Sequence, residues 1–219
     1  MSYLHMFYGV NLHVLRALFG SGDADFADEL STGWADELAE IDEWLTDADD
    51  EFPGVRTLLS DIMDGQIRHR RASAKAGYGY ALKLLCWHVG APIMHNVCCI
   101  ADQPFSSQLL KSGPPIPIPP ADDFPAIGFL EHHEIASELA RLQAALDAAT
   151  DGNSSRAKPG WLGAVLRWLG VAKAPVPTTL VERSAEHELS EDLLDDMRAY
   201  AATLQDAQAL GCALVSFYH

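Results

Sequence analysis

The stretch from Asp23 to Glu51 limits the possible folds most strongly. It contains thirteen acidic residues and no lysine or arginine. Its apolar side chains recur every three or four residues, which places them on one face of a helix and the carboxylates on the opposite face. We therefore expect one long amphipathic helix, with Asp23 as its N-cap and the Phe-Pro-Gly sequence at 52–54 after its end. The apolar positions are Phe26, Leu30, Trp34, Leu38, Ile41 and Leu45.

The remaining segments predict an α+β fold dominated by helices. Residues 3–10 and 212–218 have the aromatic and β-branched composition of strands. An isolated strand leaves its backbone N–H and C=O groups unpaired, so we expect these two terminal strands to pair in one small sheet. The spacing of apolar and capping residues predicts about six helices packed with that sheet. They span residues 11–18, 23–51, 55–64, 80–89, 131–149 and 190–210.

Three further segments have a distinctive composition. Residues 80–89 are apolar nearly all round, which predicts a central buried helix that Gly90 and Pro92 close. The basic stretch 68–75 is expected to be a loop. Residues 113–120 contain five prolines, so they can donate few backbone hydrogen bonds and should lie extended across the fold.

A length of 219 residues favours a single domain over residues 1–219, with an insertion at 151–177. The insertion is rich in Gly, Asn, Ser and Pro and has no acidic residue after its first position. It also contains Trp161, Arg167 and Trp168. Because tryptophan often anchors interfaces, these three are candidate partner-binding residues. The alternative is that the segment packs back onto its own core.

The formal net charge of −16 limits the class of partner. It repels phosphate backbones and anionic lipid, so we expect no nucleic-acid partner, whereas a basic protein fits. The most apolar stretch, residues 78–101, carries a lysine and two histidines and is interrupted by glycine and proline, which argues against stable membrane insertion. No secretory signal begins at Met1, and four cysteines are too few for a disulfide framework, so we expect free thiols in the cytoplasm.

The acidic side of residues 23–51 is a candidate interaction surface. Asp36 and Glu40 lie on it and could attract a basic partner through long-range electrostatics. The alternative is a face that is simply hydrated, as charged helix faces usually are. We favour hydration here, because we expect no aromatic side chain to point the same way as the carboxylates.

Histidine and cysteine residues supply weak candidates for a metal site. His88, His95, Cys98 and Cys99 carry ligand atoms suited to zinc, although their spacing fits no standard zinc finger. The competing interpretation is inert packing in the most apolar stretch of the chain. The sequence Glu-His-His-Glu at 131–134 could supply a base or ligands, but neighbours on a helix point about 100° apart and cannot converge alone. We therefore expect no cofactor and assign no catalytic residue.

Three segments carry a resemblance to a known group of proteins. They are MSYLHMFYGVNLHVLRALFGSGD at the start, PPIPIPPADDFPAIGFLEHHEIASELARL in the middle and LLDDMRAYAATLQDAQALGCALVSFYH at the end. In these segments the chain resembles the YfbM-like bacterial proteins and their longer relatives, which are uncharacterised. The resemblance implies an α+β domain of unknown role, transfers no catalytic residue, and leaves residues 151–177 outside the shared pattern.

Together these observations favour a non-enzymatic binding or interaction protein of the bacterial cytoplasm. An immunity protein that neutralises a basic toxin through its acidic surface is an alternative of the same class. A metal-dependent hydrolase built from histidine, cysteine and carboxylate groups is the alternative from another class.

Overall fold

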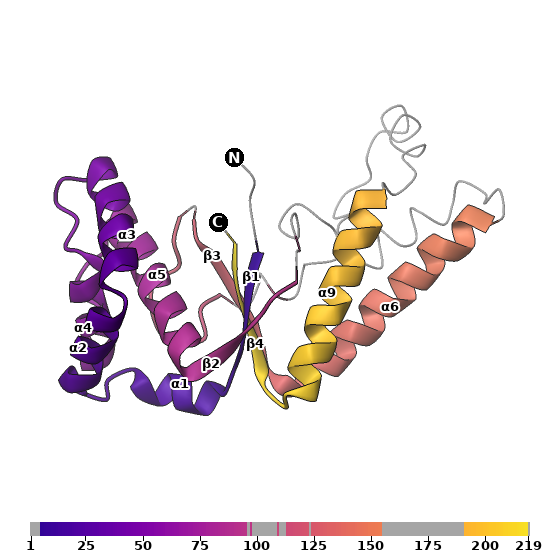
Figure 1. Ribbon diagram of the computed structural model, residues 1–219, viewed down its shortest axis with the longest axis horizontal. Coiled ribbons are helices and arrows are strands. Elements are labelled where there is room, and N and C mark those ends of the chain that lie inside the picture. Colours follow the sequence, from indigo (N-terminus) through magenta and orange to yellow (C-terminus); the bar gives the residue numbers. More distant parts are fainter. Residues whose placement is uncertain are drawn as a thin grey trace.

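In the computed structural model, the strands nearest the two ends of the chain form the centre of a four-stranded antiparallel sheet (Figure 1). The sheet order is β2-β1-β4-β3, with β1 at His5–Val10, β2 at Gly90–Ile93, β3 at Ala126–Leu130 and β4 at Ala213–Tyr218. Strands β1 and β4 pair along their whole length, from His5 opposite Tyr218 to Val10 opposite Ala213. The predicted pairing of the terminal strands is therefore confirmed.

Seven helices cover the two faces of the sheet in the part of the chain that the structure describes, which is residues 5–95, 97, 109, 113–122, 124–154 and 191–218. Five lie on one face and two on the other (Figure 1). The predicted α+β, helix-dominated fold is confirmed. The first group is α1 (Leu12–Leu18), α2 (Ala24–Gly33), α3 (Ala35–Ala48), α4 (Val55–Asp64) and α5 (Ala72–Val89), and the second is α6 (His132–Ser154) and α9 (Glu191–Ala209).

Alternation along the strands divides the core in two. Successive side chains of a strand point to opposite faces, so Tyr8 and Val215 pack with the α1–α5 group. Phe7 and Leu214 pack with α6 and α9 instead. Every residue of β4 is buried, as expected for a strand with helices on both sides. The sheet therefore has no face exposed along its centre.

The prediction of one continuous acidic helix over 23–51 is wrong, because the chain forms two helices there. Helix α2 ends at Gly33, and α3 begins two residues later. Between them Trp34 leaves the helical conformation, at φ −120° and ψ 29°, and its ring centroid lies 5.3 Å from that of Trp87 in α5. Glycine weakens the helix just before this point, and the ring contact holds the turn against α5.

Helix α5 and the strand after it also differ from the sequence prediction. The helix begins at Ala72, inside the stretch 68–75 for which the sequence predicts a loop. It ends before Gly90 as predicted, but the following residues form β2. A Cβ on Gly90 would lie 2.6 Å from the carbonyl oxygen of Gly9 in β1, so strand pairing requires the glycine. Neither β2 nor β3 is predicted from the sequence, since each is short and contains or directly follows a proline.

Capping residues fix several helix ends, and Asp23 is the N-cap that the sequence predicts. Asn11 Oδ1 accepts a hydrogen bond from the backbone N–H of His13 at 3.0 Å at the start of α1. Asp23 Oδ1 accepts one from the backbone N–H of Phe26 at 2.9 Å at the start of α2. Gly65 takes the left-handed conformation, at φ 70°, where α4 ends.

Part of the predicted insertion lies outside the described residues. Residues 151–154 belong to α6, whereas 155–177 are among those that the structure leaves undescribed. A single domain with an insertion there stays a prediction. In the proline-rich segment, Ile116 and Ile118 are buried in the core of the α1–α5 group, and bends at 115–117 interrupt the extended chain that the sequence predicts.

Candidate functional site

The exposed sides of α2 and α3, with the turn after α3, form a surface of one charge. Of the thirteen acidic residues in the stretch 23–51, eight are exposed and form neither an ion pair nor a side-chain hydrogen bond with any residue that the structure describes. We call these eight the acidic surface. They are Asp25, Glu29, Asp36, Glu37, Glu40, Glu43, Asp47 and Asp50.

The other five acidic residues of this stretch hold the helices in place. Asp23 caps α2, and Asp42 Oδ1 accepts a hydrogen bond from the backbone N–H of Val55 at 2.7 Å, at the start of α4. The remaining three form ion pairs, Asp28 with Arg56 and both Asp49 and Glu51 with Arg71.

Trp44 lies within the acidic surface and is 54% exposed. A helix turns once every 3.6 residues, so Trp44 shares a face with Glu40, four residues before it, and with Asp47, three residues after it. Its ring meets that of Tyr80 in α5 edge-on, with the centroids 5.9 Å apart. The expectation that no aromatic side chain points the same way as the carboxylates is therefore wrong.

The sequence contained a signal for Trp44. The buried stripe of α3 runs through Leu38 and Leu45 with Ile41 partly buried, a spacing of three and four residues. Trp44 falls about 100° away from Leu45 around the helix, so it lies off that stripe. An apolar residue off the buried stripe of an amphipathic helix is expected to face solvent or a partner.

Two more aromatic rings and a lysine lie along the contact between α3 and α5. Trp87 is partly exposed and packs against Trp34. The Lys83 ammonium lies 6.0 Å from the centroid of the Tyr80 ring, and burial lowers the pKa of Lys83 to about 8. Aromatic faces beside carboxylates attract lysine and arginine side chains, and the Tyr80 ring already holds one such cation.

A different carboxylate is buried where α4 packs against α5. The Asp61 side chain is 1% exposed. Its Oδ2 accepts a hydrogen bond from the Tyr78 hydroxyl at 2.6 Å, and its Oδ1 accepts one from the Arg68 guanidinium. Burial, together with the hydrogen bond to Asp61, raises the pKa of Tyr78 to about 12. These contacts fasten the loop after α4 to α5, so we assign Asp61 a structural role.

The weak metal candidates do not converge among the described residues. His88 packs its ring edge-on against a phenylalanine of α2 at 5.1 Å, and His95 Nε2 lies 2.8 Å from Asp206 Oδ2 in α9. Cys98 and Cys99 lie outside the described residues. Within the described chain, no group of three or more His, Cys, Asp or Glu side chains is placed to hold a metal ion.

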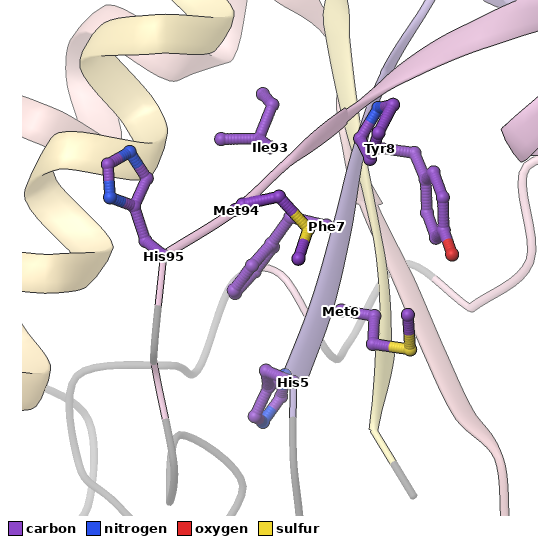
Figure 2. Close-up of a pocket in the computed structure, with 8 residues that line it drawn as sticks. His5, Met6, Phe7, Tyr8, Ile93, Met94 and His95 are labelled. Carbon is purple, nitrogen blue, oxygen red and sulfur yellow. The ribbon is translucent and has the colours of Figure 1, made fainter.

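Figure 2 shows a small pocket between β1 and the end of β2. It holds about 50 Å³, much less than the several hundred Å³ of typical organic-ligand pockets. His5 and His95 both line it, but the His5 ring stacks on those of Phe7 and Tyr218, whereas His95 Nε2 lies 2.8 Å from Asp206 Oδ2. The two imidazoles therefore do not act as a pair.

The acidic and histidine side chains at the start of α6 take separate partners. Glu134 Oε2 accepts a hydrogen bond from the backbone N–H of Glu131 at 2.8 Å, as in a capping box. The Glu131 carboxylate pairs with Arg16 at 3.0 Å, and His132 Nδ1 lies 3.3 Å from the carbonyl oxygen of Cys212. These contacts secure the helix start to two neighbouring turns and do not form a catalytic set.

Comparison with known proteins identifies the family. The model of a domain of unknown function, DUF7691, matches residues 1–219. The chain belongs to this family. No curated protein and no solved structure matches it. The description of the family names no activity.

Two other sequence predictions concern the binding properties of this DUF7691 member. Trp161, Arg167 and Trp168 lie outside the described residues, so their role in partner binding stays a prediction.

Among the helices that the structure describes, none combines the length and the apolar character needed to cross a bilayer.

Proposed function

We propose that this protein is a non-enzymatic binding protein whose acidic surface docks a basic protein. The observation that carries the proposal is Trp44, half exposed among carboxylates that form no ion pair within the described chain. Asp36 and Glu40 belong to the same surface. Its remaining members would contribute long-range attraction more than direct contacts.

Two physical effects support a basic partner. Carboxylates of one sign create a potential that steers positively charged proteins and raises their association rate, and the net charge of −16 acts in the same direction. Tryptophan is enriched at the energetic centre of interfaces, and its ring face attracts the cations of lysine and arginine. A basic partner would thus gain both fast association and a fixed contact.

Parallel pull-downs with four baits test the proposal. The baits are the wild type, Trp44→Ala, the double variant Glu40→Gln/Asp47→Asn, and the control Asp147→Asn/Asp195→Asn. The control removes the same number of charges from α6 and α9, far along the chain from the acidic surface. We expect a basic protein to be retained by the wild type and by the control, and lost from both acidic-surface variants.

The purified partner then allows a quantitative test. Trp44→Ala should weaken binding by about 2 kcal/mol, the usual threshold of an interface hot spot. Added salt should weaken binding further by slowing association. Retention of the same proteins by all four baits would contradict the proposal, and so would a captured partner that is not basic.

An immunity protein is the narrower form of this proposal. In that case the captured basic protein is a toxin. Adding the wild-type chain abolishes the activity of the toxin, whereas adding the Glu40→Gln/Asp47→Asn variant does not.

A metal-dependent hydrolase is the proposal from another class, and metal analysis of the purified full chain tests it. Stoichiometric zinc that is lost on replacing His95 or Cys98 would favour the hydrolase.

We also propose a cellular location for the protein and a relationship to a wider group of proteins. The bacterial cytoplasm suits the free thiols of Cys86 and Cys212, because a reducing compartment preserves them. A relationship to the YfbM-like proteins is supported by the strand-helix opening and the helix-strand ending of the chain. A YfbM-like structure with terminal strands that do not pair would contradict that relationship.

A further inference from the structure

Three turns meet at one end of the sheet and leave an open hollow of about 500 Å³. They are the turns from β1 into α1, from β3 into α6, and from α9 into β4, and the elements they join come together at the lower edge of Figure 1. This volume lies within the range of small-molecule sites. The polar side chains that line it include Asn11, His13, Arg16, Glu131 and His132.

Arg16 is held in a fixed position at this hollow. Its Nε donates a hydrogen bond to the carbonyl oxygen of Pro115 at 3.2 Å, and its Nη2 donates one to Glu131 Oε1 at 3.0 Å. The guanidinium carbon lies 5.5 Å from the centroid of the Phe129 ring. A guanidinium has five N–H donors, so the two hydrogen bonds leave three donors for a ligand. Because these contacts already order the Arg16 side chain, a ligand would not have to order it on binding.

The other polar groups of the hollow are mainly donors. Asn11 uses its oxygen to cap α1, which leaves its amide NH₂. His132 Nδ1 lies 3.3 Å from the carbonyl oxygen of Cys212, which only an N–H can bond. His13 is exposed at the rim. The Asn11 amide favours an acceptor, and the Arg16 guanidinium favours a negatively charged one.

One carboxylate lines the hollow, and it is already occupied. Glu131 Oε1 bonds Arg16 at 3.0 Å, and its Oε2 lies 3.6 Å from Nδ1 of His133. It would therefore compete with an anion for Arg16, and its negative charge would weaken binding of that anion. The first turn of α6, which begins beside the hollow, adds the positive end of its dipole.

The remaining lining is apolar. Leu210 is 59% exposed at the turn before β4, and Val10, Leu12 and Ala213 line the same hollow. From the fixed guanidinium, the surrounding donors and this apolar side, we infer that the hollow binds a small organic anion with a carboxylate or phosphate group and a short apolar part. This site is separate from the acidic surface and does not depend on a protein partner.

Titration of the ¹⁵N-labelled full chain followed by NMR tests the inference. The probes are inorganic phosphate, acetate and 3-methylbutanoate, with sodium chloride at matched ionic strength as the control. We expect saturable shifts of the backbone amides of residues 11–13 and 210–213 with phosphate or 3-methylbutanoate, and 3-methylbutanoate should bind more tightly than acetate. Shifts that stay linear for every probe, or that chloride reproduces, would overturn the inference.

Two variants should act in opposite directions. Arg16→Gln should raise the dissociation constant about tenfold or more, because a charge-assisted hydrogen bond is lost. Glu131→Gln should lower it, because the competing carboxylate becomes neutral. Arg198→Gln, at an exposed ion pair in α9, is the matched control and should leave the constant unchanged.

Loss of folding would not imitate this pattern. A melting curve shows whether Arg16→Gln still folds, and tighter binding by Glu131→Gln is a gain that a damaged fold cannot produce. Equal or weaker binding by Glu131→Gln, measured with the same probe, would overturn the role of Arg16 as the anion contact.

Discussion

Asp61 and Glu40 lie about twenty residues apart in the chain, yet their carboxylates occupy opposite environments. Asp61 is buried and bonded to Tyr78 and Arg68, whereas Glu40 is exposed and has no ion pair within the described chain. The difference depends on which side chains reach each carboxylate in the fold. Arg68 from the loop after α4 and Tyr78 from α5 both reach Asp61, but no basic side chain of the described chain pairs with Glu40. Carboxylates in this protein are therefore structural where the fold brings donors to them and available for binding where it does not.

The largest effect should result from removal of the buried charge. Asp61→Asn should lower the free energy of unfolding by about 3 kcal/mol, because it removes the buried charge that accepts hydrogen bonds from the Tyr78 hydroxyl and from Arg68. Urea denaturation measures the change. Asp64→Asn is the control, since its half-exposed carboxylate bonds the same Arg68 and should contribute less than about 1 kcal/mol. Equal losses in the two variants would break the comparison.

Removing the partner hydroxyl should have a smaller effect. Tyr78→Phe should lower the free energy of unfolding by about 1 to 1.5 kcal/mol, the usual contribution of one hydrogen bond. A double-mutant cycle with Asp61→Asn should give a combined loss smaller than the sum of the single losses, because both variants remove the same bond. Strict additivity would show that Asp61 acts through Arg68 alone.

High pH should weaken the same contact. The pKa of Tyr78 is raised from 10.0 to about 12 in the folded chain, first by burial and then by the hydrogen bond to Asp61. Between these two values the unfolded chain has lost the tyrosine proton and the folded chain still holds it, so stability falls as pH rises. Tyr78→Phe should show a shallower fall over this range in urea titrations. Tyr80, whose pKa is also raised to about 12, contributes equally to both chains.

The smallest effect should come from the acidic surface itself. Glu40→Gln/Asp47→Asn should change the free energy of unfolding by less than about 0.5 kcal/mol, because neither carboxylate has a partner to lose within the described chain. Urea denaturation is again the measurement. A loss above about 1 kcal/mol would mean that these carboxylates have a structural role like that of Asp61, and the proposed docking surface would then need another explanation.

Much of the fold could be predicted from local signals. Asn11 and Asp23 cap their helices, Gly65 ends another, and the two terminal strands pair, because in each case the chemistry acts within a few residues or between the most apolar segments. The break at Trp34 could not be predicted in this way. It depends on a contact with Trp87, which only the packing of α3 against α5 brings near.

The candidate sites were predictable to a smaller extent. The sequence placed Asp36 and Glu40 on an exposed acidic face, and the position of Trp44 off the buried stripe of α3 was a signal that the prediction did not use. The hollow beside Arg16 depends on three turns that are distant in sequence, and neither the spacing of residues nor their composition brings those turns together. Asp61 was missed for the same reason, since its burial depends on how α4 packs against α5.

The pairing of β1 with β4 at the centre of the sheet affects how the chain can fold during its synthesis. About two hundred residues separate the paired Val10 and Ala213. At translation rates of roughly 5 to 20 residues per second, β1 leaves the ribosome some 10 to 40 s before its central neighbour is synthesised. Throughout that interval Phe7 and Tyr8 lack the neighbouring strand that helps to bury them. The nascent chain therefore exposes an unpaired strand edge with aromatic side chains, which is a surface that chaperones bind.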